Sequence, residues 1–337
     1  MKYFYLFFLL LVNDLANAQI EIQNLYKTWV LTKSTYTDGT ELPLNHPLKF
    51  TYQRYTFLKS GKYRLSLSYE YSDNEKPFQL NKGILSLKTK EGFVMNRLKM
   101  KTLSDTLALI QAGEMGFEDS SALILKFVPE EVYQASHPVG IGDIYQINGG
   151  DTTYFGSHKV YPIYKGGSLE SKLYDRIGEY INMNNRNAFL IASFFVLKNG
   201  IADSVHILKG VDPAFNNLFI RLFNEEKKNW KAATLRGKNV NTLMKVFIRY
   251  SSSNSVPAYF LRQKGWNAFQ NGNFKMALSF YEESLAIDPY YSQSFLNRGL
   301  CKLILGDKTG ACEDWQNAKN TGSLVAPDLL LEKYCTN

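Results

Sequence analysis

The sequence repeats itself at a spacing of 34 residues near its C-terminal end. Small residues recur in both copies, and Pro289 follows the first of them. Small residues at equivalent places in two such segments predict helix pairs whose helices cross closely. The predicted packing positions are Gly265, Gly272, Ala277, Tyr281, Pro289, Gly299, Gly306, Ala311 and Trp315.

Residues 258–325 resemble a pair of tetratricopeptide repeats, within a helical domain over 253–325. A short helix within 326–337 would cap the pair. Arrays of this family bind peptides or partner proteins on a concave face, although a purely structural cap is the alternative. A free-standing array usually needs at least three repeats. We therefore expect the pair to dock on the preceding domain or to form a homodimer.

Residues 158–252 follow the order helix, hairpin, helix, strand. Leu169, Leu173, Ile177 and Ile181 recur every four residues, which predicts a helix from about Ser168. The Asn-Gly at 199–200 predicts a tight hairpin, and 213–223 has a second helical pattern. Alternation from 244 to 250 predicts a closing strand. We expect an α+β domain with two helices on a three-stranded antiparallel sheet, whose last strand lies at an open edge.

This unit resembles the TonB C-terminal domain. The matching residues are YPIYKGG at 161–167, FVLKNGIADSV at 195–205, VDPAF at 211–215, Trp230, Gly237-Lys238 and VFIRY at 246–250. In that family an extended peptide of an outer-membrane transporter adds to the sheet edge. The membrane anchor and Pro-rich spacer of energy-transducing members are absent from this sequence. The resemblance implies a peptide-binding edge at Leu243, Met244, Lys245, Val246, Phe247, Ile248, Arg249 and Tyr250. A neighbouring domain or a second copy covering this edge is the alternative.

Short strands separated by tight turns fill residues 24–131, which predicts an all-β barrel or sandwich over 19–134. Trp29, FLKSGKY at 57–63, KGIL at 82–85 and DTLAL at 105–109 resemble lipocalin-like domains of exported bacterial proteins. That resemblance implies a barrel, either filled by its own core or holding a small apolar molecule. Glycine-rich residues 135–157 are interpreted as a linker.

Residues 1–18 have the pattern of a secretory signal peptide, with one lysine, an apolar run and small residues at 16 and 18. We expect a soluble protein of the periplasm or the exterior, neither lipidated nor integral to a membrane. The net charge of +8 comes from scattered residues, which does not favour nucleic-acid binding.

All three cysteines lie near the C-terminal end. In an oxidising compartment we expect a disulfide between Cys312 and Cys335, leaving Cys301 buried. The four histidines, at 46, 137, 158 and 206, have no histidine or cysteine at metal-ligand spacing. With no catalytic motif either, we predict no enzyme, no metal and no cofactor.

These features together favour an exported, non-enzymatic adaptor of the bacterial envelope. It would bind peptide segments of envelope proteins, including outer-membrane transporters, through the sheet edge and the helical repeats. The alternative hypothesis is a carrier or sensor of a small apolar molecule held in the barrel.

Overall fold

The computed structural model describes residues 22–69, 74–180, 188–251, 255–322 and 324–335. They form two units. The first contains the N-terminal strands, and the second contains the residues after Ser136 together with Pro43–Tyr52 and a short segment from Ser68. The predicted signal peptide at 1–18 and the predicted helix position Ile181 lie outside the described residues.

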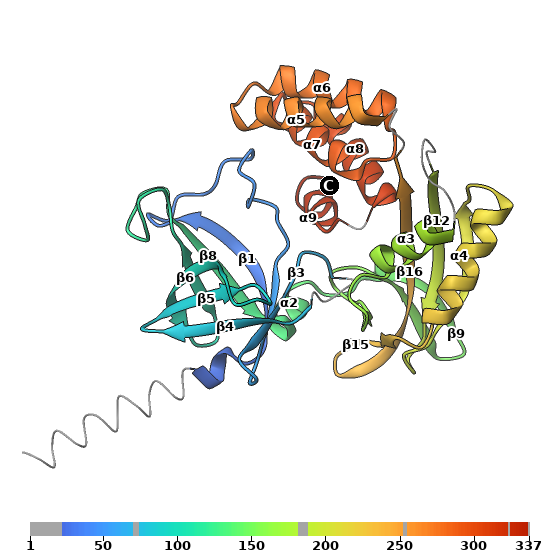
Figure 1. The fold of residues 1–337 in the computed structure, drawn as a ribbon, viewed down its shortest axis with the longest axis horizontal. Helices are drawn as coiled ribbons and strands as arrows, with labels where there is room; N and C mark the ends of the chain where they lie inside the picture. Colours follow the sequence, from blue (N-terminus) through green and yellow to red (C-terminus); the bar gives the residue numbers. More distant parts are fainter. Residues whose placement is uncertain (1–21, 70–73, 181–187, 252–254, 323, 336–337) are drawn as a thin grey trace, which may run out of the picture. The chain divides into compact units, whose positions relative to one another are not determined.

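The first unit is a closed barrel in which each strand pairs antiparallel with its neighbour and the last strand pairs with the first (Figure 1). Its N-terminal all-β character, predicted from the sequence, is confirmed. The strands are β1 (Thr28–Tyr36), β2 (Arg54–Leu58), β3 (Lys62–Ser66), β4 (Lys76–Asn81), β5 (Ile84–Lys88), β6 (Val94–Leu103), β7 (Leu107–Gln111) and β8 (Leu123–Pro129).

Large side chains fill the inside of the barrel, because alternate residues of every strand point inward. Trp29, Phe57 and Phe127 are each at most 1% exposed. The ring of Tyr55 lies 5.7 Å from that of Phe57 and 5.6 Å from that of Phe127, measured between centroids. The indole of Trp29 donates a hydrogen bond to the carbonyl of Leu25 (3.0 Å), which ties the helical turn at 22–25 to the barrel.

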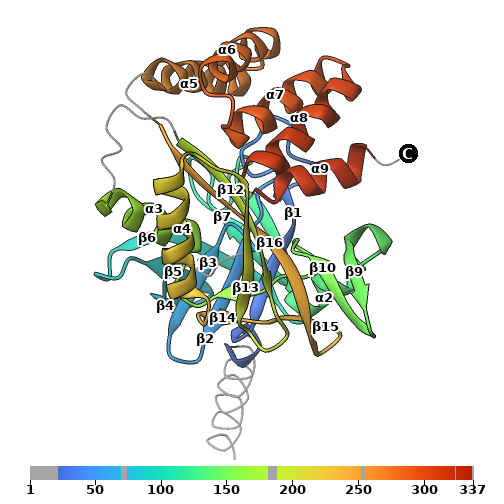
Figure 2. The same cartoon turned by 90° about the vertical axis from the view of Figure 1, so that its right-hand side faces the viewer.

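The second unit begins after α2 (Glu130–Ser136) and contains a mixed sheet. The strand order is β13-β12-β16-β10-β9, and β15 pairs with one end of β16. Figure 2 shows β16 between β12 and β10. A separate two-stranded pair is formed by β11 and β14. The strands are β9 (Ile144–Asn148), β10 (Asp151–Phe155), β11 (Ile163–Tyr164), β12 (Ala188–Val196), β13 (Ala202–Lys209), β14 (Trp230–Lys231), β15 (Ala233–Leu235) and β16 (Lys238–Tyr250).

Two helices, α3 (Leu169–Tyr180) and α4 (Pro213–Glu226), pack against one face of this sheet. Asp212 begins α4 by accepting a hydrogen bond from the amide of Phe215 (2.8 Å), with a proline at the first turn. The ring of Phe223 lies 4.8 Å from that of Phe194 in β12. The apolar stripes that predict these helices are therefore the faces that they bury.

The sheet is wider than the three-stranded sheet predicted from the sequence. Residues 135–157, interpreted as a linker, contain the short 3-10 helix η1 (Ile141–Asp143) and the strands β9 and β10. Strand β10 pairs parallel with β16, from Thr153 opposite Asn241 to Phe155 opposite Leu243. The boundary between the two units falls after Ser136, within this segment, but the segment is not an unstructured linker, because Gly149 and Gly150, at φ values of 54° and 93°, form the turn between β9 and β10.

The C-terminal part is helical, as predicted. Antiparallel pairs are formed by α5 with α6 and by α7 with α8, followed by one more helix. A β-carbon built on Gly265 would lie 3.0 Å from the ring of Tyr281, and one on Gly299 would lie 2.4 Å from that of Trp315. The helices are α5 (Val256–Gln270), α6 (Phe274–Ile287), α7 (Ser292–Ile304), α8 (Lys308–Thr321) and α9 (Ala326–Tyr334).

The C-terminal helices dock on the sheet of the same unit. Asp288, which follows α6, accepts hydrogen bonds from Arg249 of β16 (2.6 Å) and from Arg262 of α5 (3.3 Å). The ring of Tyr290 stacks on that of Phe189 in β12 at a centroid distance of 4.4 Å. These contacts agree with the expectation that a pair of repeats would rest on the preceding domain.

Candidate functional site

The predicted binding residues, Leu243–Tyr250, form the second half of β16. Strand β12 pairs with all of them on one side, from Leu243 opposite Phe195 to Tyr250 opposite Ala188. At the start of β16, β15 pairs with residues 238–240, and on the side away from β12, β10 pairs with residues 241–243. The carbonyl of Leu243 also accepts a hydrogen bond from the amide of Gly156 (2.9 Å). The unpaired edge therefore starts after Leu243, which corrects the predicted boundary.

From Met244 to Tyr250, none of the strands in the described ranges pairs with this outer side of β16. The amide of Phe247 donates to Oε1 of Glu170 on α3 (3.0 Å), so this amide points away from β12. Because backbone groups alternate sides along a strand, the amides of Lys245 and Arg249 point the same way. A carboxylate thus takes one of the positions that the carbonyl of an added strand would fill.

The two faces of this edge differ in chemistry. Met244, Val246, Ile248 and Tyr250 are buried beneath the two helices, whereas Lys245 is exposed on the opposite face. Partial burial of its ammonium and the nearby ammonium of Lys319 on α8 lower the pKa of Lys245. An added strand would meet apolar groups on one face and positive charge on the other.

A small apolar recess opens beside the edge at the start of α3. It lies against Met244, Lys245 and Val246 of β16. Its remaining lining residues are Ser168, Leu169, Glu170, Phe194 and Trp230. Its volume of about 20 Å³ could receive one methyl-sized group from a side chain of a segment paired with β16.

Six of the nine predicted packing positions of the helical part lie between helices, whereas Gly272, Pro289 and Gly306 are exposed. Gly265, Ala277, Tyr281, Gly299, Ala311 and Trp315 are all buried. Gly272 and Gly306 occupy the two inter-helix turns at φ values of 76° and 92°, where glycine is favoured. These residues shape the helix pairs, and any bound partner would contact other side chains.

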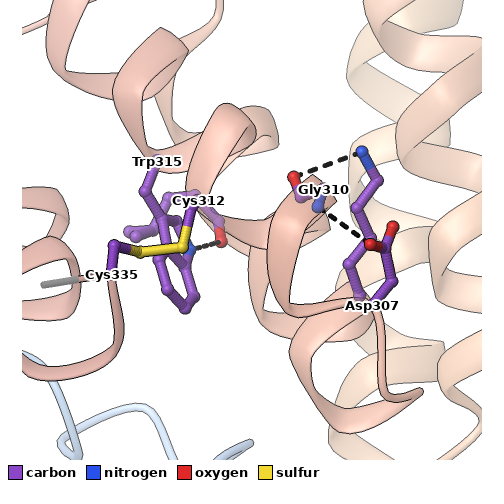
Figure 3. Close-up of a disulfide and its surroundings, with 7 residues drawn as sticks. Asp307, Gly310, Cys312, Trp315 and Cys335 are labelled. Atoms are coloured by element: carbon purple, nitrogen blue, oxygen red, sulfur yellow. Dashed lines mark hydrogen bonds between the residues drawn. A yellow bond between two sulfur atoms is a disulfide. The ribbon is translucent and has the colours of Figure 1, made fainter. Parts of the chain in front are cut away.

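A disulfide joins Cys312 of α8 to Cys335 directly after α9, with a Cα–Cα distance of 5.9 Å. Figure 3 shows it beside Trp315, whose indole donates to the carbonyl of Leu296 (3.3 Å). Cys301 is buried, and burial raises the pKa of its thiol to about 12. The disulfide fixes the last helix to the helix pairs, whereas Cys301 packs in the core.

The interior of the barrel bears on the alternative of a small-molecule carrier. A side chain that lined a cavity wide enough for a ligand would expose part of its surface to that cavity. Trp29, Phe127, Leu98 and Leu109 are 0% exposed and Phe57 is 1% exposed. The ring of Tyr55 packs against those of Phe57 and Phe127, and this burial favours a filled core over a ligand-holding barrel.

The histidines are less isolated than the sequence suggests. The rings of His137 and His158 lie 5.4 Å apart, and Nε2 of His158 lies 3.7 Å from Glu332 of α9. Lys159 lies 2.8 Å from the same carboxylate and 3.4 Å from Asp143. Within the described part of the chain, no three His, Cys, Asp or Glu side chains are grouped so that they could hold a metal ion.

A buried carboxylate, Glu226 of α4, has structural partners. It accepts hydrogen bonds from the hydroxyl of Tyr164 (2.5 Å) and the amide of Asn229 (2.7 Å), and Lys172 lies 2.7 Å away. Burial opposes ionisation, but these neighbours outweigh it and lower the pKa of Glu226. The cluster joins α3 and α4 to β11.

The sequence did not indicate Glu170 or β10 as parts of the edge. An acidic residue in the first turn of a helix is common, so Glu170 gives no distinctive signal.

Among the described residues, no helix is both long enough and apolar enough to span a membrane. No protein-family model matches the chain, and no curated protein is similar to it.

Proposed function

We propose that the protein is an exported, non-enzymatic adaptor that binds extended peptide segments by strand addition to β16. The observation that carries this proposal is the outer side of Met244–Tyr250, which no strand within the described ranges occupies. A row of outward backbone groups is a template for another strand. The amide of Phe247 already donates to one substitute partner, the carboxylate of Glu170.

Backbone pairing would supply part of the affinity, and side chains would supply selectivity. A bound segment would place the end of one small apolar side chain in the recess bounded by Leu169, Phe194 and Trp230. On its other face, an acidic side chain would complement Lys245 and Lys319. The resemblance to the TonB C-terminal domain makes periplasmic segments of outer-membrane transporters the first partners to test.

The signal-like N-terminal sequence supports action in the periplasm. The helical part, with its resemblance to tetratricopeptide repeats, would offer a second surface for protein segments. Its salt bridge from Arg249 to Asp288 and the stacking of Phe189 on Tyr290 fix it to the sheet. A partner could therefore engage both surfaces of one firmly connected unit.

The test is a pair of substitutions at one position. Lys245→Pro removes an outward amide that an added strand would use, and edge strands tolerate proline when the lost N–H faces solvent. Lys245→Ala removes the same side chain but keeps the amide. We expect peptides captured by the native protein to lose at least about tenfold in affinity with the proline variant, relative to the alanine variant. Equal affinity for the two variants would refute strand addition at this edge.

A further inference from the structure

The segment Pro43–Tyr52 connects two barrel strands, yet by its contacts it belongs to the second unit. The side-chain amide of Asn45 donates to the carbonyls of Phe269 and Gln270, both at 3.2 Å. In return, Nε2 of Gln270 donates to the carbonyl of Asn45 (2.6 Å). The segment is thus bound at the C-terminal end of α5 through reciprocal hydrogen bonds.

The end of α5 is suited to this contact. The last carbonyls of a helix have no partner within the helix, so they accept hydrogen bonds from outside it. Phe50, five residues after Asn45, packs against the apolar cluster that includes Phe269, Ala268 and Leu296. One polar anchor and one aromatic anchor therefore hold the segment.

The segment has a defined shape of its own. The amide of His46 donates to the carbonyl of Pro43, and the amide of Lys49 donates to that of His46, both at 3.0 Å. The hydroxyl of Thr51 donates to the carbonyl of Pro47 (2.7 Å). Two prolines and these turns restrict the unbound segment, which lowers the entropy lost on docking.

We propose that the C-terminal end of α5 is a docking site for a turned peptide carrying an asparagine and, five residues later, an aromatic residue. Pro43–Tyr52 is its resident occupant, and it leaves the site when a partner segment of the same chemistry competes for it. The site is separate from the edge of β16, so it stands without the function proposed for that edge. The helical part then recognises a protein segment at a helix end in addition to any groove.

The experiment uses the full-length protein and a fluorescent synthetic peptide that spans residues 41–54. In the Asn45→Ala, Phe50→Ala double variant, both anchors of the resident segment are lost and the site on α5 is intact. We expect the peptide to bind this variant at least about tenfold more tightly than the native protein. A peptide carrying Asn45→Ala should bind at least about fivefold more weakly than the unaltered peptide.

A matched pair of changes on α5 locates the site. Gln270→Ala, added to the double variant, removes the donor to Asn45 and should weaken peptide binding about fivefold. Asn267→Ala, an exposed position on the same helix, should leave it unchanged. Circular dichroism and thermal melting establish that each variant is folded. Equal binding to the native and double-variant proteins, or no binding to a folded double variant, would overturn the proposal.

Discussion

Replacement of Glu170 by alanine should expose one particular backbone amide of β16. The amide of Phe247 donates to the Glu170 carboxylate at 3.0 Å, and hydrogen bonds to charged groups contribute about 1.5–3 kcal/mol. Loss of that bond should speed hydrogen exchange at Phe247 by about tenfold to about a hundredfold. The amides of Met244 and Val246, which face β12, should keep their protection because β12 remains paired.

The measurement is residue-resolved hydrogen exchange by nuclear magnetic resonance on the native protein and two variants. Glu170→Gln keeps an acceptor oxygen without the charge, so exchange at Phe247 should rise by less than in Glu170→Ala. Faster exchange at Met244 and Val246, with Phe247 unchanged, would show that the backbone faces the opposite way. The proposed binding edge would then be wrong. A uniform increase along β16 would instead reveal general destabilisation and refute the local role of Glu170.

Three further predictions test contacts in the second unit. His158, helped by a neighbouring lysine, lowers the pKa of Glu332 from 4.5 to about 2. The carboxylate should therefore stabilise the fold above pH 4.5, by about 1 kcal/mol after solvent screening. This contribution should vanish as the pH falls from 4.5 to about 2, seen as convergence of the melting temperatures of native and Glu332→Gln proteins. Cys335→Ser opens the loop closed by residues 23 positions apart and should lower the free energy of unfolding by about 3 kcal/mol relative to the oxidised native protein in urea titrations. Gly299→Ala should cost about 1–3 kcal/mol by overpacking against an indole, whereas the exposed helical control Gly178→Ala should be neutral or stabilising by up to about 1 kcal/mol.

Local patterns predicted much of the architecture because they record which side of each element is buried. Phe57 and Tyr63 flank a tight turn in neighbouring strands and face each other in the barrel, as their strand spacing indicates. The stripe containing Phe215 and Leu222 is the buried side of α4. Gly265 and Gly299, one repeat apart, contact aromatic rings in equivalent ways.

The missed features depend on contacts between distant segments. Strand β10 has polar residues along most of its length, so it lacks the apolar alternation by which a strand is recognised. Its pairing with β16 joins Thr153 to Asn241, far apart in sequence. Docking of Asn45 on the end of α5 joins residues more than two hundred positions apart. Neither contact leaves a local pattern in the sequence. The polar character of β10 explains why the glycine-rich segment reads as a linker.

The presence of β10 limits what a partner can gain at the edge of β16. A partner strand can pair only with the part beyond Leu243, where Lys245, Phe247 and Arg249 present outward backbone groups. Backbone hydrogen bonds contribute about 1 kcal/mol each, whereas association costs at least about 4 kcal/mol in lost freedom. So short a pairing leaves little net affinity from the backbone alone. The recess beside Trp230 has a volume of only about 20 Å³, so burial of one methyl-sized group there would add about 0.8 kcal/mol. We therefore expect the residue that faces this recess to decide which segments bind.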